Sequence, residues 1–270
     1  MTCYAARWAV ALATLLAVES SCSSSTAPVE PPGRSVLFVG NSLTYSNDLP
    51  AMVEKIAVAD GDPLRVGMVA GPNMAVIDHT PDGSEARREI AGSDWAFVVL
   101  QQGPTPAGIC RDTLVIAAMR LAPGIREAGG RPVLFLPWAR RSFPQSLGPA
   151  AESATAAARA VGGVVAPVGH AWKEALRANP DLALYGGDGY HPARAGTLLA
   201  ALTIYQRLYG RDVRNIPSAA IAAIAGVPLS PAGIDALASA AHAAAAMLPA
   251  DPSTPAPPDT TRLSPGGGPC

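Results

Sequence analysis

The sequence SVLFVGNSLT, residues 35–44, decides how the rest of the chain is interpreted, because a run of β-prone apolar residues ends abruptly at Gly-Asn-Ser. This pattern predicts a buried strand that delivers Ser42 to a sharp turn at its carboxyl end. In open α/β sheets, ligands bind at the carboxyl ends of the strands. Ser42 is therefore either a nucleophile, if a base can reach it, or a cap for the next helix, since Ser and Asn are favoured caps.

Strand-like and helix-like segments alternate along the chain that follows. Apolar runs predict four more strands, at residues 64–69, 95–100, 132–136 and 164–168. Helical spacing predicts helices at residues 49–60, 113–128, 147–161, 171–178 and 193–209, with two Ala-rich outer helices at 218–224 and 231–247. This alternation indicates an α/β fold in which a five-stranded parallel sheet lies between two helical layers.

The two ends of the chain differ in composition from its middle. Residues 1–22 have the pattern of a signal peptide, with a weakly basic start, a short apolar run and then small residues. Cys22 resembles the cysteine of a bacterial lipoprotein cleavage site, but Glu19 stands where an apolar residue is usual, so lipidation and plain secretion both stay open. Residues 23–34 are expected to be a Ser/Pro-rich tether and residues 249–270 a disordered Pro-rich tail, which leaves one domain at 35–248.

Composition narrows the classes of function. The chain has 270 residues, 49% of them hydrophobic, which is enough for a sizeable core. A net charge of -1 gives no basic surface for nucleic acid. We expect Cys110 to be an ordinary residue, with a Cys110–Cys270 bond left open, because a core of this size needs no disulfide. No Cys/His cluster has metal-ligand spacing and no phosphate- or dinucleotide-binding glycine motif occurs, so neither metal nor cofactor is expected.

A base for Ser42 is best sought among the four histidines. Asp188 precedes His191 by three residues in a turn-rich loop, just before a predicted helix. That spacing allows the carboxylate to hold one imidazole nitrogen while the other faces outward. The alternative is that both are ordinary loop residues that cap the following helix.

Two short blocks together resemble the SGNH hydrolases, also called the GDSL esterase/lipase superfamily. Residues 40–44, GNSLT, are similar to the first block of that family, and residues 188–192, DGYHP, to its last, Asp-x-x-His. The resemblance covers about residues 35–210. It implies a flavodoxin-like three-layer fold and a triad of Ser42 as nucleophile, His191 as base and Asp188 as the group that orients the base.

The middle blocks of the family are matched less well. The resemblance implies an oxyanion hole built from the N–H groups of Ser42 and of Gly71, which follows the second predicted strand. The family's third block supplies an asparagine amide, but residues 101–103 here are Gln-Gln-Gly. A glutamine amide carries the same donor on a longer stem, so Gln101 is the expected substitute, with Gln102 as the alternative.

Several residues near the predicted strand ends are candidate substrate contacts. They are Asn41, Asn73, His79, Trp138, Arg140 and Tyr190. Asn41 could instead hold the turn, and His79 could be a surface loop residue. Trp138 is a candidate wall for an acyl or sugar group. Arg140 and Arg141 suit an anionic substrate, or form a solvated charged pair.

The sequence thus predicts an exported serine esterase, either secreted or held as an outer-membrane or cell-surface lipoprotein, that acts through an acyl-enzyme. The resemblance and the expected address favour short acyl groups, such as the O-acetyl esters of carbohydrates, as a small-molecule or glycan substrate. A lipase or lysophospholipase, an acyltransferase, and a binding protein that has lost catalysis remain as alternatives.

Overall fold

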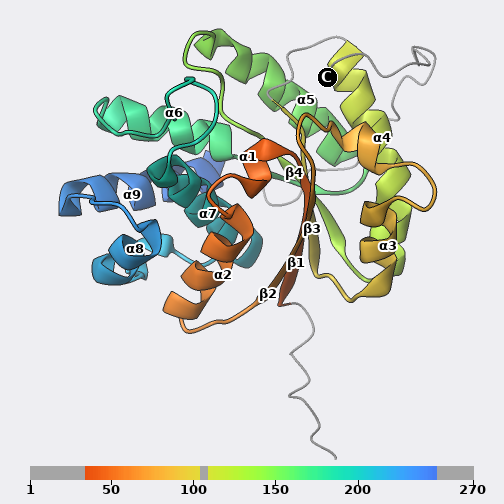
Figure 1. Ribbon diagram of the computed structural model, residues 1–270, viewed down its shortest axis with the longest axis horizontal. Helices are drawn as coiled ribbons and strands as arrows, with labels where there is room; N and C mark the ends of the chain where they lie inside the picture. The colour runs from red at the N-terminus through yellow and green to blue at the C-terminus, as the bar shows by residue number, and fades with distance from the viewer. Residues whose placement is uncertain (1–33, 104–108, 248–270) are drawn as a thin grey trace, which may run out of the picture. The chain divides into compact units, whose positions relative to one another are not determined.

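The computed structural model describes residues 34–103 and 109–247, and all statements of structure refer to these. Five parallel strands form one sheet (Figure 1). They are β1 (Ser35–Gly40), β2 (Arg65–Ala70), β3 (Phe97–Gln101), β4 (Arg131–Phe135) and β5 (Val164–Ala166), in the order β2-β1-β3-β4-β5. This is the flavodoxin-like order, so the predicted fold class is confirmed.

Helices cover both faces of the sheet, which gives three layers (Figure 1). One face carries α2 (Leu49–Ala59), α6 (Val168–Ala178), α7 (Arg194–Tyr209), α8 (Ser218–Ala225) and α9 (Pro231–Met247). The other carries α3 (Glu85–Gly92), α4 (Ile109–Glu127) and α5 (Leu147–Ala160). A short helix, α1 (Ser42–Tyr45), follows β1 directly, and the 3₁₀ turns are η1 (Val76–His79), η2 (Pro144–Ser146) and η3 (Val213–Asn215).

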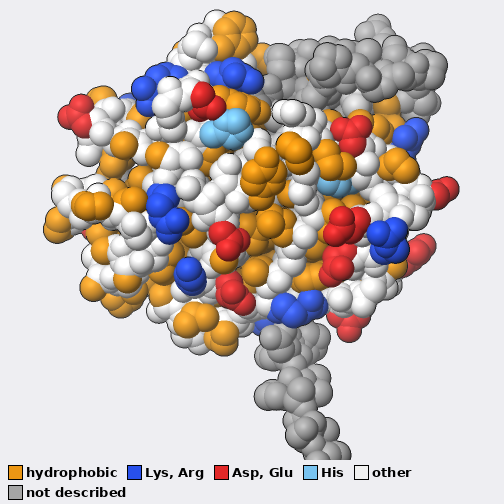
Figure 2. Space-filling view, in the orientation of Figure 1, with side chains coloured by type: hydrophobic (Ala, Val, Ile, Leu, Met, Phe, Trp, Pro, Cys, Tyr) orange, Lys and Arg blue, Asp and Glu red, His pale blue; other side chains and the backbone are white. Residues whose placement is uncertain are grey.

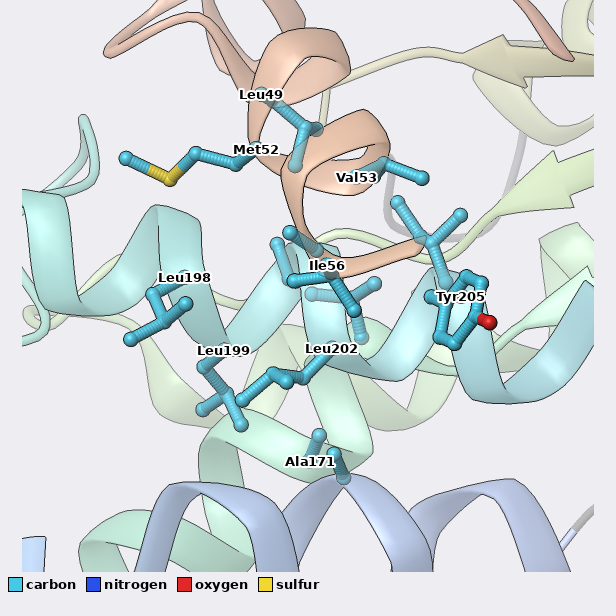
Figure 3. Close-up of a cluster of buried hydrophobic side chains, with 14 of the residues drawn as sticks. Leu49, Met52, Val53, Ile56, Ala171, Leu198, Leu199, Leu202 and Tyr205 are labelled. Carbon is cyan, nitrogen blue, oxygen red and sulfur yellow. The ribbon is translucent and has the colours of Figure 1, made fainter. Parts of the chain in front are cut away.

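Strand β1 contributes to both cores because its side chains alternate between the two faces of the sheet. Val36 and Phe38 pack with the α2/α7 side, whereas Leu37 and Val39 pack with the α3/α4/α5 side, and all four are fully buried. Figure 3 shows the first core, where Leu49, Met52, Val53 and Ile56 of α2 face Leu198, Leu199, Leu202 and Tyr205 of α7. Burial on both sides therefore fixes the strand whose end carries Ser42.

The boundaries differ from the predicted ones on both sides of β4, and α4 begins at Ile109 where a start at residue 113 was expected. Strand β5 ends at Ala166, two residues earlier than expected, because α6 already begins at Val168. A Cβ at Gly169 would collide with the backbone oxygen of Pro137, so glycine lets the helix start against the end of β4. Helix α3 was not predicted, and it is a short element capped by Ser84, whose hydroxyl accepts from the N–H of Arg87 at 3.3 Å.

Other predictions concern segments beyond this part of the chain. The signal peptide with Cys22, residues 23–33 of the tether, and the tail lie outside the described residues. Among residues 34–103 and 109–247, no helix is long and apolar enough to cross a membrane. The expectation that Cys110 is an ordinary residue is wrong, since Cys110 is disulfide-bonded. The other three cysteines of the chain lie outside the described residues.

Candidate active site

The turn that carries Ser42 is held by the side chain of Asn41. Its Oδ1 accepts from the N–H of Leu43 at 3.1 Å, which caps α1, and its Nδ2 donates to the carbonyl of Met74 at 2.9 Å. Asn41 is also 93% buried, with only 7% of its surface exposed. Both ends of its amide are thus bonded within the protein, which favours the role of Asn41 in the turn over the expected substrate contact.

Gln101 occupies a different place from the one expected. Its side-chain oxygen accepts from the N–H of Asn41 at 2.9 Å and from the hydroxyl of Thr44 at 2.8 Å, and the residue is fully buried. These two donors fix the orientation of the amide, because the flipped form would set donors against donors. Nε2 is buried and has no partner within the described residues, so it does not face the open side of the site. Gln101 therefore supports the turn from below rather than offering a donor to an oxyanion.

Gln102, the alternative, is also committed elsewhere. Its oxygen accepts from the N–H of Val76 at 3.3 Å, and its nitrogen donates to the carbonyl of Cys110 at 3.4 Å. Only 2% of the residue is exposed. It connects η1 to the start of α4, and the sequence could not reveal this because both partners come from other elements.

The carbonyl of Gly40 collects two donors behind the same turn. The N–H of Gly71 donates to it at 3.3 Å, and the Nε2–H of His79 donates to it at 3.0 Å. His79 is buried, and burial lowers the pKa of its imidazole, which keeps it neutral. The expectation of a substrate contact at His79 is therefore wrong, and the Gly71 N–H is directed at β1 rather than at open space.

Asp188 fixes the orientation of His191. Its Oδ1 accepts from the backbone N–H groups of Tyr190 and His191, both at 2.9 Å, and its Oδ2 lies 2.6 Å from His191 Nδ1. The hydrogen bond from His191, with help from that of the Tyr190 N–H, lowers the pKa of the Asp188 carboxyl to about 2. An ionised acceptor at this distance keeps the proton of a neutral imidazole on Nδ1, which leaves Nε2 as an acceptor.

Ser42 lies at that second nitrogen. Its Oγ is 2.9 Å from His191 Nε2, although 149 residues separate the two in the chain. Asp188, His191 and Ser42 thus form one hydrogen-bonded line that ends in a hydroxyl. Such a line can move the hydroxyl proton to the imidazole while the oxygen attacks an electrophile.

The loop that bears His191 is fastened to the end of β4. Trp138 Nε1 donates to the carbonyl of Tyr190 at 2.8 Å, and the backbone N–H of Arg141 donates to the carbonyl of Gly189 at 2.9 Å. Trp138 is 1% exposed and stacks on Trp172, with ring centroids 3.9 Å apart. Trp138 is therefore a core residue that positions the loop, which corrects its assignment as a wall for substrate.

Asn47 ties the Ser42 segment to the His191 segment, and the sequence analysis missed it. Its Nδ2 donates to the carbonyl of Pro192 at 3.0 Å and to the hydroxyl of Thr197 at 2.9 Å. Its backbone is left-handed, with a φ of 56°. Asn tolerates this conformation, so Ser-Asn-Asp at 46–48 was a turn signal, but its distant partners could not be inferred.

Three of the candidate substrate contacts remain open to solvent or partly so. Asn73 is exposed and left-handed, with a φ of 58°, and its side chain has no hydrogen bond within the described residues. Arg140 is exposed and lies over the ring of the half-buried Tyr190, 3.8 Å from its centroid.

Among residues 34–103 and 109–247, no group of three His, Cys, Asp or Glu side chains could hold a metal ion.

Solved structures share this architecture. A protein from Slackia heliotrinireducens, provisionally assigned to the SGNH hydrolases, is 25% identical with a TM-score of 0.56, over 64% of this chain and 98% of that chain. A DUF4886 family protein from Bacteroides uniformis has a TM-score of 0.60 at 20% identity, over 78% of this chain and 93% of that one. TesA has a TM-score of 0.50 at 17% identity, over 65% and 98%. No family model and no curated protein matches the sequence.

Proposed function

We propose that this chain, an SGNH hydrolase by its fold and by its likeness to solved structures, is a serine esterase with Ser42, His191 and Asp188 as its triad. The observation that carries the proposal is the hydrogen-bonded line from Asp188 through His191 to Ser42, with 2.6 Å and 2.9 Å between its polar atoms. The line lies at the carboxyl ends of the strands, where ligands of open α/β sheets bind.

The proposed reaction has two halves. Ser42 Oγ attacks the ester carbonyl while its proton passes to His191 Nε2, and the Asp188 carboxylate stabilises the imidazolium that forms. His191 then returns that proton to the departing alkoxide, which leaves an acyl group on Ser42. In the second half, His191 takes a proton from water, the resulting hydroxide equivalent attacks the acyl-enzyme, and the acid departs as the proton returns to Ser42.

The developing oxyanion needs donors other than the two glutamines. The Ser42 N–H is a first donor, because it begins α1 and has no hydrogen-bond partner within the described residues. Asn73 is the second that we propose, since its amide is exposed and has no partner in the same part of the chain. Asn41, which precedes Ser42, donates through its Nδ2 to the carbonyl of Met74, which follows Asn73, and this bond connects the two segments. Losing one such donor lowers turnover about 10²- to 10³-fold in other acyl-transfer enzymes.

The substrate class that we propose is a short acyl ester, such as the O-acetyl ester of a carbohydrate, and the site of action is outside the cytoplasm. The signal-peptide pattern of residues 1–22 supports the address, and the mass of the mature amino terminus tests lipidation at Cys22. A lipase acting on long chains is the second candidate, and the low share of aromatic residues, 5% of the chain, argues against it.

The purified protein should hydrolyse 4-nitrophenyl acetate and react covalently with a fluorophosphonate. Ser42→Ala should abolish both, whereas Ser46→Ala, a change of the other serine in the same turn, should retain both. Labelling that is equal in wild type and Ser42→Ala would refute Ser42 as the nucleophile. A wild-type protein that does neither would favour a binding protein without catalysis, and acylated sugar products would identify an acyltransferase.

A further inference from the structure

Arg140 lies one aromatic ring away from the proposed base. Its guanidinium is 3.8 Å from the centroid of the Tyr190 ring, and that ring meets the His191 ring edge to face, with centroids 5.0 Å apart. Arg140 is exposed, whereas Tyr190 is half-buried. The Tyr190 ring therefore links a solvent-facing cation to the reacting end of the site.

Arg141 adds a second cation to the same rim. Its guanidinium lies over the ring of Tyr185 at 4.9 Å, and its backbone N–H donates to the carbonyl of Gly189 in the loop of the base. The hydroxyl of Tyr185 in turn donates to the carbonyl of Ala139 at 2.8 Å. These contacts fix the cationic rim, which we define as Arg140 and Arg141 on Tyr190 and Tyr185, to the His191 loop.

Neither guanidinium of the cationic rim pairs with a carboxylate within residues 34–103 and 109–247. Arginines elsewhere in that part of the chain do so, namely Arg34, Arg87, Arg111, Arg177, Arg211 and Arg214. The acid that faces Tyr190 is Asp188, and its carboxylate is already bound to His191. Two cations thus face one carboxylate, and the imbalance grows when His191 takes a proton. Figure 2 shows basic side chains in blue gathered beside a histidine at the end of the molecule where α1 lies.

The position of each guanidinium over an aromatic ring suits recognition of a planar anion. A guanidinium that lies on an aromatic face still presents its N–H groups at its edge, and their fork matches the two oxygens of a carboxylate. The ring also holds the side chain in place, which reduces the entropy lost on binding.

We infer that the cationic rim selects esters that carry a carboxylate close to the scissile bond, as the acyl esters of acidic sugars do. This inference rests on the proposed esterase function and names the substrate class of that same site. Arg140 binds the carboxylate, and Arg141 adds to the positive potential. The carboxylate can lie on the alcohol part or on the acyl part of the ester, and paired substrates separate the two.

The test compares kcat/KM for matched anionic and neutral esters. 4-Acetoxybenzoate against 4-acetoxybenzamide places the charge on the alcohol part, and 4-nitrophenyl hydrogen succinate against 4-nitrophenyl butanoate places it on the acyl part. In at least one pair, Arg140→Gln should lower the anionic-to-neutral ratio about two- to fivefold, as expected for an exposed charge pair. The intrinsic reactivities of the two esters cancel in the comparison of variant with wild type, and so does any loss of folded enzyme.

Arg159→Gln is the matched control, because it removes the same charge from the exposed end of α5, and it should leave both ratios unchanged. Arg140→Lys should give an intermediate ratio, since a lysine keeps the charge without the fork. Added salt should reduce the preference of the wild type, because it screens exposed charges. If the wild type turns over the neutral esters but neither ratio changes in Arg140→Gln, the inference is wrong and the esterase stands. If no ester is turned over and Ser42 is not labelled, the proposed function itself fails.

Discussion

Replacing Gln101 with methionine tests whether its side-chain oxygen holds the turn of Ser42. Methionine keeps the length of the side chain but accepts hydrogen bonds only weakly. The change leaves two buried donors without a partner, the N–H of Asn41 and the hydroxyl of Thr44. Each buried donor left without a partner lowers the free energy of unfolding by about 1–3 kcal/mol. Methionine also removes the Nε2 of Gln101, a buried group that has no partner in the wild type, and this change raises the free energy of unfolding by a similar amount. The expected net loss of unfolding free energy is therefore about 1–3 kcal/mol.

Urea unfolding followed by tryptophan fluorescence measures this loss, and Thr44→Val completes a double-mutant cycle. Because the Thr44 hydroxyl donates to the Gln101 oxygen, the two changes should be non-additive by about 1 kcal/mol. A Gln101→Met protein within about 0.5 kcal/mol of wild type, with additive changes in the cycle, would show that the Gln101 oxygen does not stabilise the turn. Unchanged stability with turnover lowered about 10²-fold would instead restore Gln101 as an oxyanion donor.

Two further changes test the turn and the base. Gly40→Ala should destabilise the protein by about 1–3 kcal/mol, because its Cβ would lie 2.5 Å from the Gln101 oxygen, whereas Gly148→Ala, with open space around it, should not. The same unfolding experiment measures both, and equal stabilities would contradict the predicted collision. Asp188→Asn should lower kcat about 10³- to 10⁴-fold at pH 7, since the neutral amide no longer stabilises the imidazolium, and a loss under tenfold would exclude Asp188 from the triad. The pKa of Asp188 falls on folding from 3.8 to about 2, so its contribution to stability is present above pH 3.8 and disappears as the pH drops through about 2. Any loss of activity between pH 7 and 4 should therefore not come from protonation of Asp188.

Much of the fold could be predicted because the inner strands are buried on both faces. A parallel strand covered by helices reads as a continuous apolar run, and residues 36–39 and 97–100 do so. Helix α3 escaped because it has only eight residues, Glu85–Gly92, and its mean composition is polar. The end of β5 and the start of α6 differ from the predicted positions, because Gly169 allows α6 to begin close to the backbone of Pro137. The periodicity of the sequence does not reveal such a contact.

In the candidate site, residues in short local motifs could be predicted, whereas roles that depend on contacts between distant segments could not. Ser42, Asp188 and His191 could be located because each belongs to a short local motif, and the bonds within the last block join residues three apart or fewer. The role of Gln101 could not be predicted, since its orientation depends on donors 57 and 60 residues away. Trp138 sits at a strand end, as expected, but its burial against Trp172 is a matter of tertiary packing.

The helix that follows His191 also decides when the site can exist during synthesis. All five strands have been synthesised once β5 is made. The partners of Asn47, however, are Pro192 and Thr197, which follow Asn47 by 145 and 150 residues, and His191 follows Ser42 by 149 residues. Contacts of such long sequence separation carry a large loop-closure entropy, and they cannot form before the later residue has been synthesised. A nascent chain that ends after β5 therefore contains all five strands and Ser42, but it lacks His191, the proposed base. Covalent labelling of Ser42 would consequently report when the His191 segment has docked against the serine turn during synthesis.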